Sequence, residues 1–155
     1  MLRRTVFSLL ASLPSDGEII VLDDASTDGS ADPNGWNCAN VRVLRPPERL
    51  GAARARNFGA EHARGRIIVF CDAHIEVPLG WVERFSAVLK QPQVGAVGAV
   101  VSAMDNPSLK GYGFLWSDAL FNMHWLEQKG SEPYPVPMLG SCFLAVRRDT
   151  FEATG

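Results

Sequence analysis

The sequence has few cysteines and no motif that pairs them. Its three cysteines, Cys38, Cys71 and Cys142, are widely spaced, without a Cys-x-x-Cys pair. We therefore expect reduced thiols, with neither a disulfide framework nor a zinc site. No apolar run is long enough to span a bilayer, and the apolar patch within residues 1–13 is too short and too interrupted for a signal peptide. These absences favour a cytoplasmic protein, either free or at the membrane surface.

Two glycine-rich signatures and a large excess of positive charge are also missing. No Gly-x-Gly-x-x-Gly follows a strand, which disfavours an NAD-dependent dehydrogenase. A sugar-nucleotide pyrophosphorylase would need a glycine-rich, lysine-bearing opening, which is absent. The formal net charge of -2 argues against a general nucleic-acid binder. Residues 42–66 nevertheless carry seven arginines, which suggests a specific anionic ligand, although a solvated helix face is the simpler explanation for any single one.

The length and amino-acid composition are those of one globular domain. The chain has 155 residues, of which 46% are hydrophobic and 21% charged, and this suits a single domain, residues 1–155, with one core. Short apolar runs alternate with segments of helical periodicity, as in a parallel sheet packed between helices. The sequence therefore predicts an α/β fold. We expect residues 94–104 to form another buried strand and most aromatic residues of the segment 114–125 to join the core.

The stretch Ile67–Glu76 combines a buried strand with polar side chains. Four apolar residues are followed by Asp72 and His74 at alternate positions, and in an extended chain these two side chains point to one side. Ligands of open α/β sheets bind at the carboxyl ends of strands. A carboxylate with an imidazole suits a divalent ion such as manganese. The alternative is a turn-forming Asp and a surface His.

Two adjacent carboxylates, Asp23 and Asp24, follow the predicted strand of residues 18–22. They repel each other unless a ligand or local donors offset their charge. One interpretation is an Asx turn that caps the next helix. The other is a nucleoside site, in which a carboxylate accepts hydrogen bonds from a base or from ribose hydroxyls. The segment alone does not decide between them.

Residues 49–64 predict a helix with an anion site at its start. Gly51 would let a ligand approach the backbone closely, and Arg54 and Arg56 follow within the first turns. Free N–H groups, the helix dipole and guanidinium groups together favour a diphosphate. The alternative is an amphipathic helix whose arginines only face water.

These stretches, taken together, resemble one family. Ile19–Ser30 and Leu50–Gly59 resemble the first Asp motif and the Gly-Ala-Arg-Asn helix of the inverting family-two glycosyltransferases, and Ile67–Glu76 falls where that family carries Asp-x-Asp. The Asp-Ala-His variant, with Gly80–Glu83 after it, is similar to the motif of polypeptide N-acetylgalactosaminyltransferases, as are the aromatics of residues 114–125 and the segment 137–143. The motifs occur in the family's order and cover nearly the whole chain.

The resemblance implies a GT-A (Rossmann-like) fold with a mostly parallel sheet and helices on both faces. It also implies a nucleotide-sugar donor, which we expect to be UDP-linked, with Mn2+ or Mg2+, and an acceptor hydroxyl on a carbohydrate, lipid or protein. The implied donor-binding residues are Asp23, Asp24, Arg54, Arg56, Asp72, Gly140 and Ser141. The implied metal ligands are Asp72 and His74. Inverting members use a carboxylate base, whereas the Asp-x-His relatives retain configuration, so the stereochemistry stays open.

Two departures from the family pattern lead us to expect a partial catalytic domain, incomplete at both ends. The chain opens on a predicted helix, without the family's first strand, and ends at Gly155, before the region that carries the family's further carboxylate or metal ligand. We therefore expect the catalytic base to lie beyond Gly155. The alternative function is a catalytically inactive nucleotide-sugar-binding fragment or interaction module.

Overall fold

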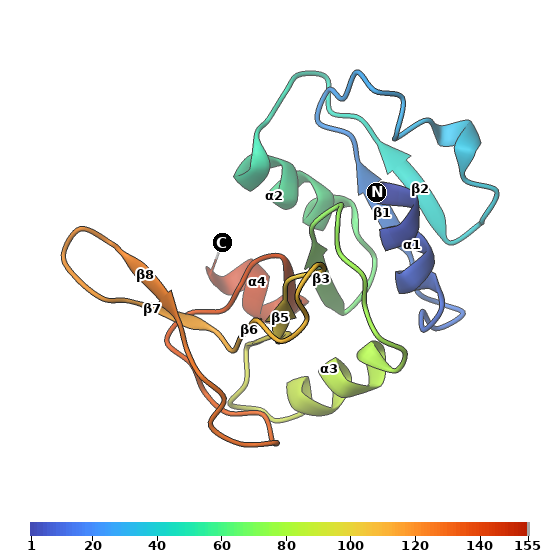
Figure 1. Cartoon of the computed structure of the whole chain (residues 1–155). Coiled ribbons are helices and arrows are strands. Elements are labelled where there is room, and N and C mark those ends of the chain that lie inside the picture. Colours follow the sequence, from blue (N-terminus) through green and yellow to red (C-terminus); the bar gives the residue numbers. More distant parts are fainter. Residues whose placement is uncertain (155) are drawn as a thin grey trace.

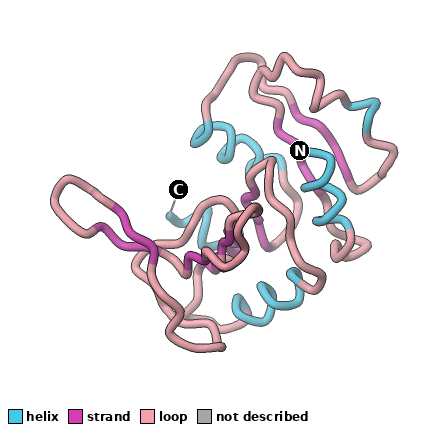
Figure 2. The backbone as a smooth tube through the Cα atoms, viewed as in Figure 1, coloured by secondary structure: helices cyan, strands magenta, loops and turns pink. Residues whose placement is uncertain are grey.

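The computed structural model describes residues 1–154, which form a chain of short helices and strands joined by long loops (Figures 1 and 2). No helix in this range is both long and apolar enough to cross a membrane. The elements, in order, are α1 (Leu2–Leu10), β1 (Ile19–Leu22), the 3-10 helix η1 (Pro33–Gly35), β2 (Val41–Leu44), α2 (Ala52–His62), β3 (Ile67–Cys71), α3 (Trp81–Leu89), β4 (Ala96–Gly98), β5 (Val101–Ser102), β6 (Lys110–Gly111), β7 (Phe114–Trp116), β8 (Met123–Trp125), β9 (Phe143–Arg147) and α4 (Arg148–Thr154).

The strands do not form the mostly parallel sheet that we expected. Among the described residues, only β1 and β2 pair in parallel. Strand β9 lies between β3 and β4 and runs antiparallel to both, and the two remaining pairs, β5–β6 and β7–β8, are antiparallel hairpin-like contacts. The apolar runs predicted the strands, although Ile67 of β3 is exposed and only Ile68 of that run is fully buried. Such a run does not report the direction of the neighbouring strand.

Helices cover both faces of the β3–β9–β4 sheet, as predicted. Side chains alternate along β9 because successive residues of a strand point to opposite faces. Phe143 and Ala145 pack against Trp81 and Phe85 of α3 on one face. Val146 packs with Ala60 of α2 and, more loosely, with residues of α4 on the other face. This arrangement places α2 directly beside the carboxyl end of β3.

Helix α1 covers the β1–β2 pair. Val6 packs against Val21 and Val41, one from each strand, and Trp36 from the loop after η1 borders the same cluster. The hydroxyl of Thr5 also donates to the carbonyl oxygen of Ala73, 3.1 Å away. Helix α1 therefore contacts both the β1–β2 pair and the turn that follows β3.

Two expectations about the second half of the chain are wrong. Residues 94–104 form two short strands, β4 and β5, which belong to different sheets. The aromatic segment 114–125 forms a hairpin that projects from the body of the molecule (Figure 1), and Trp116 and Trp125 are about half exposed. Its rings pack on each other: Trp116 meets Phe121 edge-to-face at 4.9 Å between ring centroids. A dense aromatic pattern therefore indicated pairing within a hairpin here, and not burial in the core.

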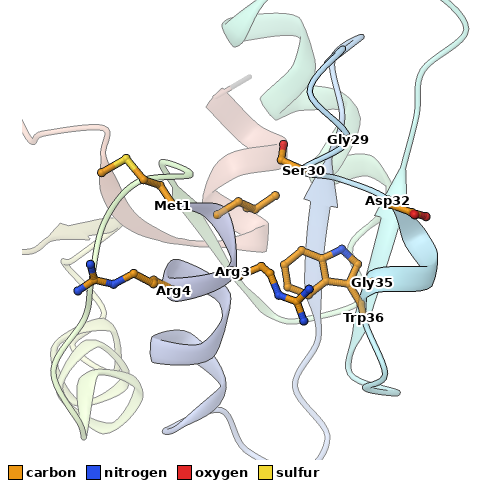
Figure 3. A pocket seen from close by; sticks show the side chains of 9 residues that line it. Met1, Arg3, Arg4, Gly29, Ser30, Asp32, Gly35 and Trp36 are labelled. Atoms are coloured by element: carbon orange, nitrogen blue, oxygen red, sulfur yellow. The ribbon is translucent and has the colours of Figure 1, made fainter.

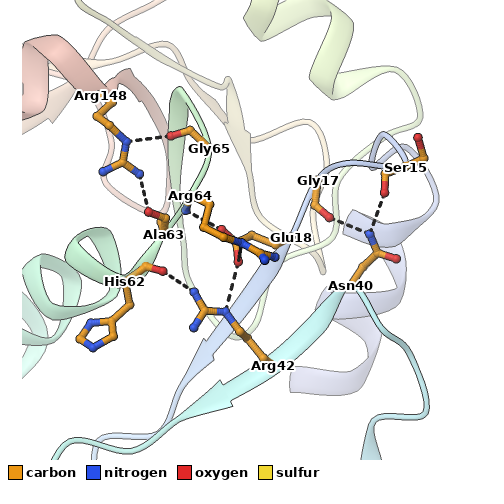
Figure 4. Close-up of polar contacts among 10 residues, drawn as sticks. All are labelled: Ser15, Gly17, Glu18, Asn40, Arg42, His62, Ala63, Arg64, Gly65 and Arg148. Atoms are coloured by element: carbon orange, nitrogen blue, oxygen red, sulfur yellow. Dashed lines mark hydrogen bonds and ion pairs between the residues drawn. The ribbon is translucent and has the colours of Figure 1, made fainter.

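Glu18, just before β1, joins the end of α2 to the β1–β2 pair (Figure 4). Its carboxylate accepts from the Nε of Arg42 at 3.1 Å and from the backbone N–H of Arg64 at 2.6 Å. Arg42 also donates to the carbonyl oxygen of His62. Burial would raise the pKa of Glu18, but the donors of Arg64 and Arg42 outweigh it and hold this pKa below the usual value of a glutamate. The charged form of Glu18 therefore stabilises the fold.

We expect Glu18→Gln to lower the free energy of unfolding by about 1–3 kcal/mol at pH 7, because it removes the charge from a largely buried hydrogen-bonded carboxylate. A carboxyl whose pKa is lowered by folding stabilises the protein above its unfolded pKa, and this contribution disappears as the pH falls through its folded pKa. The difference between Glu18→Gln and the wild type in urea denaturation should therefore shrink in acid. Glu48→Gln is the matched control, because Glu48 pairs with Arg54 in an exposed salt bridge. Equal losses for the two variants would contradict the role of Glu18.

Candidate functional site

The two adjacent carboxylates after β1 are held by different parts of the chain. Asp23 is buried, with 4% of its surface exposed. It accepts a hydrogen bond from the backbone N–H of Ser26 at 2.8 Å and another from the Nε of Arg45 at 2.7 Å. The Ser26 N–H and the guanidinium of Arg45 outweigh burial and lower the pKa of Asp23. Asp23 thus closes the turn after β1.

Asp24 reaches the start of α2. One carboxylate oxygen accepts from the backbone N–H of Leu50 at 2.6 Å and the other from that of Gly51 at 2.8 Å. Gly51 has a φ of 76° and a ψ of 165°, a backbone conformation that is open essentially to glycine alone. Asp24 therefore bonds to the start of α2, far along the sequence, whereas our local interpretation was an Asx turn that caps the next helix. The protein's own carboxylate takes the N–H groups just before α2, where we expected a diphosphate.

The two arginines of α2 point to different surroundings. Arg54 pairs with Glu48 at 3.1 Å, and both side chains are 67% exposed. Arg56 lies two residues further along α2 and turns inward. Its Nη2 donates to the carboxylate of Asp72 at 3.0 Å and to the carbonyl oxygen of Ser141 at 3.1 Å. Of the two, only Arg56 joins the other predicted site residues.

Arg56, Asp72 and Ser141 meet at the carboxyl end of β3. Asp72 follows β3 directly, and its backbone N–H donates to the carbonyl oxygen of Cys142 at 2.8 Å. This bond extends the β3–β9 pairing by one residue, so the segment that contains Gly140 and Ser141 must run beside Asp72. The side chains of Arg56 and Asp72 are each 34% exposed, which leaves them within reach of a ligand.

His74 does not follow Asp72 along an extended strand. Strand β3 ends at Cys71, and Ala73 and His74 form a turn, which the hydroxyl of Thr5 holds by its bond to Ala73. The expectation that an extended chain would align Asp72 and His74 is therefore wrong. His74 is exposed and lines a hollow of about 20 Å³ with Arg4 and Glu76.

The donors around Asp72 allow only a partial metal site. Within residues 1–154, no group of three or more His, Cys, Asp or Glu side chains could hold a metal ion. Burial, followed by the charge of Asp72, raises the pKa of the Cys71 thiol to about 12, and the same causes raise that of Cys142. Both cysteines therefore stay protonated at neutral pH. A carboxylate and an imidazole still fit a cation that completes its coordination with water and phosphate oxygens.

Arg45 is a site residue that our sequence reasoning missed. It supplies the charge that balances Asp23, and it donates to the carbonyl oxygen of Ala31 at 3.4 Å. A signal was present: Arg45 directly follows β2, and the carboxyl ends of parallel neighbouring strands meet at one edge of a sheet. The parallel pairing of β1 with β2 places Arg45 beside Asp23 for this reason.

Curated proteins with similar sequences include polypeptide N-acetylgalactosaminyltransferases. A putative polypeptide N-acetylgalactosaminyltransferase 13 of Drosophila melanogaster is 32% identical over 183 residues, which cover 100% of this chain and 32% of the relative. The human polypeptide N-acetylgalactosaminyltransferase 13 is 28% identical over 179 residues, which cover 99% of this chain and 32% of the relative. The chain thus spans about a third of the length of these curated relatives.

Two solved structures share the fold. GalNAc-T7, solved with UDP, GalNAc and Mn2+, matches 99% of this chain and 33% of its own chain with a TM-score of 0.78 and 24% identity. The mannosyltransferase PcManGT of Pyrobaculum calidifontis, solved with GDP-Man and Mn2+, matches 99% of this chain and 42% of its own chain with a TM-score of 0.71 and 21% identity. The GT-A fold that we expected is therefore confirmed. The sequence model of the family described as glycosyl transferase family 2 matches residues 1–155, and the chain belongs to that family.

Proposed function

We propose that this chain binds a UDP-linked sugar together with Mn2+ or Mg2+ and takes part in transferring the sugar to an acceptor hydroxyl. The observation that carries the proposal is the meeting of Arg56, Asp72 and Ser141 at the end of β3. They come from three segments, and none is buried. The presence of UDP, GalNAc and Mn2+ in GalNAc-T7, and of GDP-Man and Mn2+ in PcManGT, supports the same class of ligand. The acceptor would be a carbohydrate, lipid or protein hydroxyl.

The divalent ion would be held by Asp72 and His74. Only one carboxylate oxygen of Asp72 contacts Arg56, so the other oxygen is available to a cation. His74, which is exposed in the turn that follows Asp72, would be the second ligand. When bound, the ion supplies positive charge that stabilises the departing nucleoside diphosphate.

Arg56 would bind the diphosphate directly. Both of its contacts use Nη2, and within residues 1–154 neither its Nε nor its Nη1 has a hydrogen-bond partner. Three N–H groups of a guanidinium therefore remain for phosphate oxygens, and guanidinium groups bind such oxygens in pairs. Arg56 could thus hold Asp72 and the donor at the same time.

The remaining predicted residues would position the other parts of the donor. Each carboxylate oxygen of Asp24 accepts one N–H and keeps further acceptor capacity, which a nucleobase N–H can use. Asp23 would keep that loop in place through Ser26 and Arg45. Gly140 and Ser141 would border the sugar, since Ser141 lies on Arg56 beside Asp72.

A second candidate is a module that binds the nucleotide sugar without turning it over. The observation in its favour is that the described residues offer no set of three metal ligands. The two candidates predict the same donor binding and differ in turnover. Release of UDP from a panel of UDP-sugars, measured with and without sugar or peptide acceptors, separates them.

The first test of donor binding is a calorimetric titration of UDP into the protein, with Mn2+ and without it. We expect binding that is about tenfold or more tighter with the metal, because an ion held by Asp72 would add positive charge beside the diphosphate. Equal affinity in the two conditions, or no binding in either, would overturn the proposed metal-dependent donor site.

Asp72→Asn and His74→Ala should each weaken Mn2+-dependent UDP binding by about tenfold or more, since each removes one proposed ligand of the cation. The residual binding without Mn2+ should change little. Asp105→Asn, on an exposed loop, is the control for a general loss of acidic charge. The ligand assignment fails if both site variants bind UDP as the wild type does in Mn2+.

Arg56→Ala and Arg54→Ala form a matched pair on one helix. We expect Arg56→Ala to weaken UDP binding by about tenfold, because a charge-assisted contact to phosphate is lost. Arg54→Ala should stay within about twofold of the wild type, since Arg54 only pairs with exposed Glu48. The reverse order of the two effects would show that Arg54, and not Arg56, reaches the donor.

A further inference from the structure

Helix α1 carries a row of hydroxyl groups on the side that faces the segment after β3. Thr5, Ser8 and Ser12 follow one another at intervals of three and four residues, which places them on one side of a helix. Ser12 lies just beyond the end of α1 and continues the row. Thr5 is 2% exposed, and the two serines are half-buried. Because buried hydroxyl groups in native proteins are hydrogen-bonded, the partners of this row indicate its role.

All three hydroxyl groups bond to the backbone of residues 73–80, the segment that joins β3 to α3. Thr5 donates to the carbonyl oxygen of Ala73 at 3.1 Å, Ser8 accepts from the N–H of Val77 at 3.3 Å, and Ser12 accepts from the N–H of Gly80 at 2.9 Å. Within residues 1–154, the backbone of residues 73–79 makes no hydrogen bond to the backbone of another element. Side chains of α1 therefore supply the hydrogen bonds that attach this segment to the rest of the protein.

Arg4 adds an ionic contact to the same segment. Its guanidinium lies 2.5 Å from the carboxylate of Glu76, and the two side chains are 71% and 43% exposed. Figure 3 shows Arg3 and Arg4 extending from α1 in opposite directions, with Arg3 on the side of Trp36. Because an exposed ion pair contributes little, the bond from buried Thr5 is the stronger constraint on the start of the segment.

The bond from Thr5 acts between the two proposed metal ligands. Ala73 lies between Asp72 and His74 in the chain, and its carbonyl oxygen belongs to the peptide group that joins it to His74. Because a peptide group is planar, a bond that fixes this oxygen also fixes the direction in which the chain enters His74. On the other side of Ala73, the bond from the Asp72 N–H to Cys142 fixes Asp72. The two proposed ligands are therefore held from different elements, one from α1 and one from the segment before β9.

We propose that Thr5 is a positioning residue for the divalent ion, because its bond to Ala73 holds the turn from which His74 would join Asp72 on the cation. This inference rests on the proposed metal-dependent donor site. Groups that are oriented before a ligand arrives lose less conformational entropy when it binds. Removal of a partner that orients a metal ligand typically lowers metal affinity by about 10–100-fold. Thr5 contacts neither the donor nor the ion in this role and acts through the position of His74.

The test measures the affinity for UDP by calorimetry, with Mn2+ and without it, and takes the ratio of the two affinities as the gain from the metal. Thr5→Val keeps the shape of the side chain but removes the hydroxyl group. We expect it to lower this gain by about fivefold or more, while UDP binding without Mn2+ stays within about twofold of the wild type. Thr5→Ser keeps a hydroxyl group and should therefore restore the gain.

Ser12→Ala is the matched control. It removes an equivalent bond from the same row, but at the far end of the segment, at Gly80. A merely structural role of the row would make Thr5→Val and Ser12→Ala alike in both thermal melting and the gain from Mn2+. We expect the two variants to differ in the gain. Thermal melting also checks that each variant is folded, and Thr5→Ala takes the place of Thr5→Val if the valine variant does not fold.

The outcomes separate this inference from the donor site. A wild type without any gain from Mn2+ overturns the metal-dependent donor site, and the role of Thr5 falls with it. A gain in the wild type that Thr5→Val keeps overturns the role of Thr5 alone and leaves the donor site standing. The same holds if Thr5→Ser or Ser12→Ala loses the gain as fully as Thr5→Val does. A loss that the serine variant restores and the control does not share upholds the inference.

Discussion

The site depends on strand β9, which pairs along both of its edges. Its pairing with β3 extends past the strand end, to the bond between the Asp72 N–H and the Cys142 carbonyl. The guanidinium of Arg56 therefore contacts both Asp72 and Ser141, the second of which lies 85 positions further along the sequence than Arg56. The register of β3 with β9 fixes this proximity, because a shift by one residue would turn the side chains of β9 to the opposite faces. Core packing by Phe143 and Ala145 thus fixes the position of the polar residues as well.

The carboxylates at the end of β1 already have hydrogen-bond partners before any ligand binds. Asp23 and Asp24 follow one another, yet Arg45 and Ser26 hold the first, while the N–H groups of Leu50 and Gly51 hold the second. Both carboxylates also tie the segment between β2 and α2 to the end of β1. A site whose groups are already oriented loses less conformational entropy when a ligand arrives. The same bonds explain why the start of α2 is less open to an outside anion than its sequence suggested.

Local sequence patterns predicted the parts of the fold that local chemistry decides. The apolar runs before Asp23 and Asp72 are strands, and the alanine-rich segment with Arg54 and Arg56 is a helix. The failures concern long-range contacts. The direction of β9 depends on its neighbours in space, the turn at His74 depends on a bond from Thr5, and the two arginines differ only in what lies opposite them. The spacing of residues in the sequence does not reveal these long-range contacts. The family motifs nevertheless pointed to Arg56, Asp72 and Ser141, which lie in contact in the structure.

The hairpin β7–β8 is stabilised mainly by contacts within itself. Its rings pair with each other, Phe114 with Trp125 and Trp116 with Phe121, and Asp118 receives its hydrogen bonds from Leu120 and Asn122 within the same turn. Replacement of the exposed tip residue Leu120 therefore leaves the packing of α3 against β9 unchanged. The length and the residue types of this hairpin tip can therefore change during evolution while the packing of the β3–β9–β4 sheet stays the same.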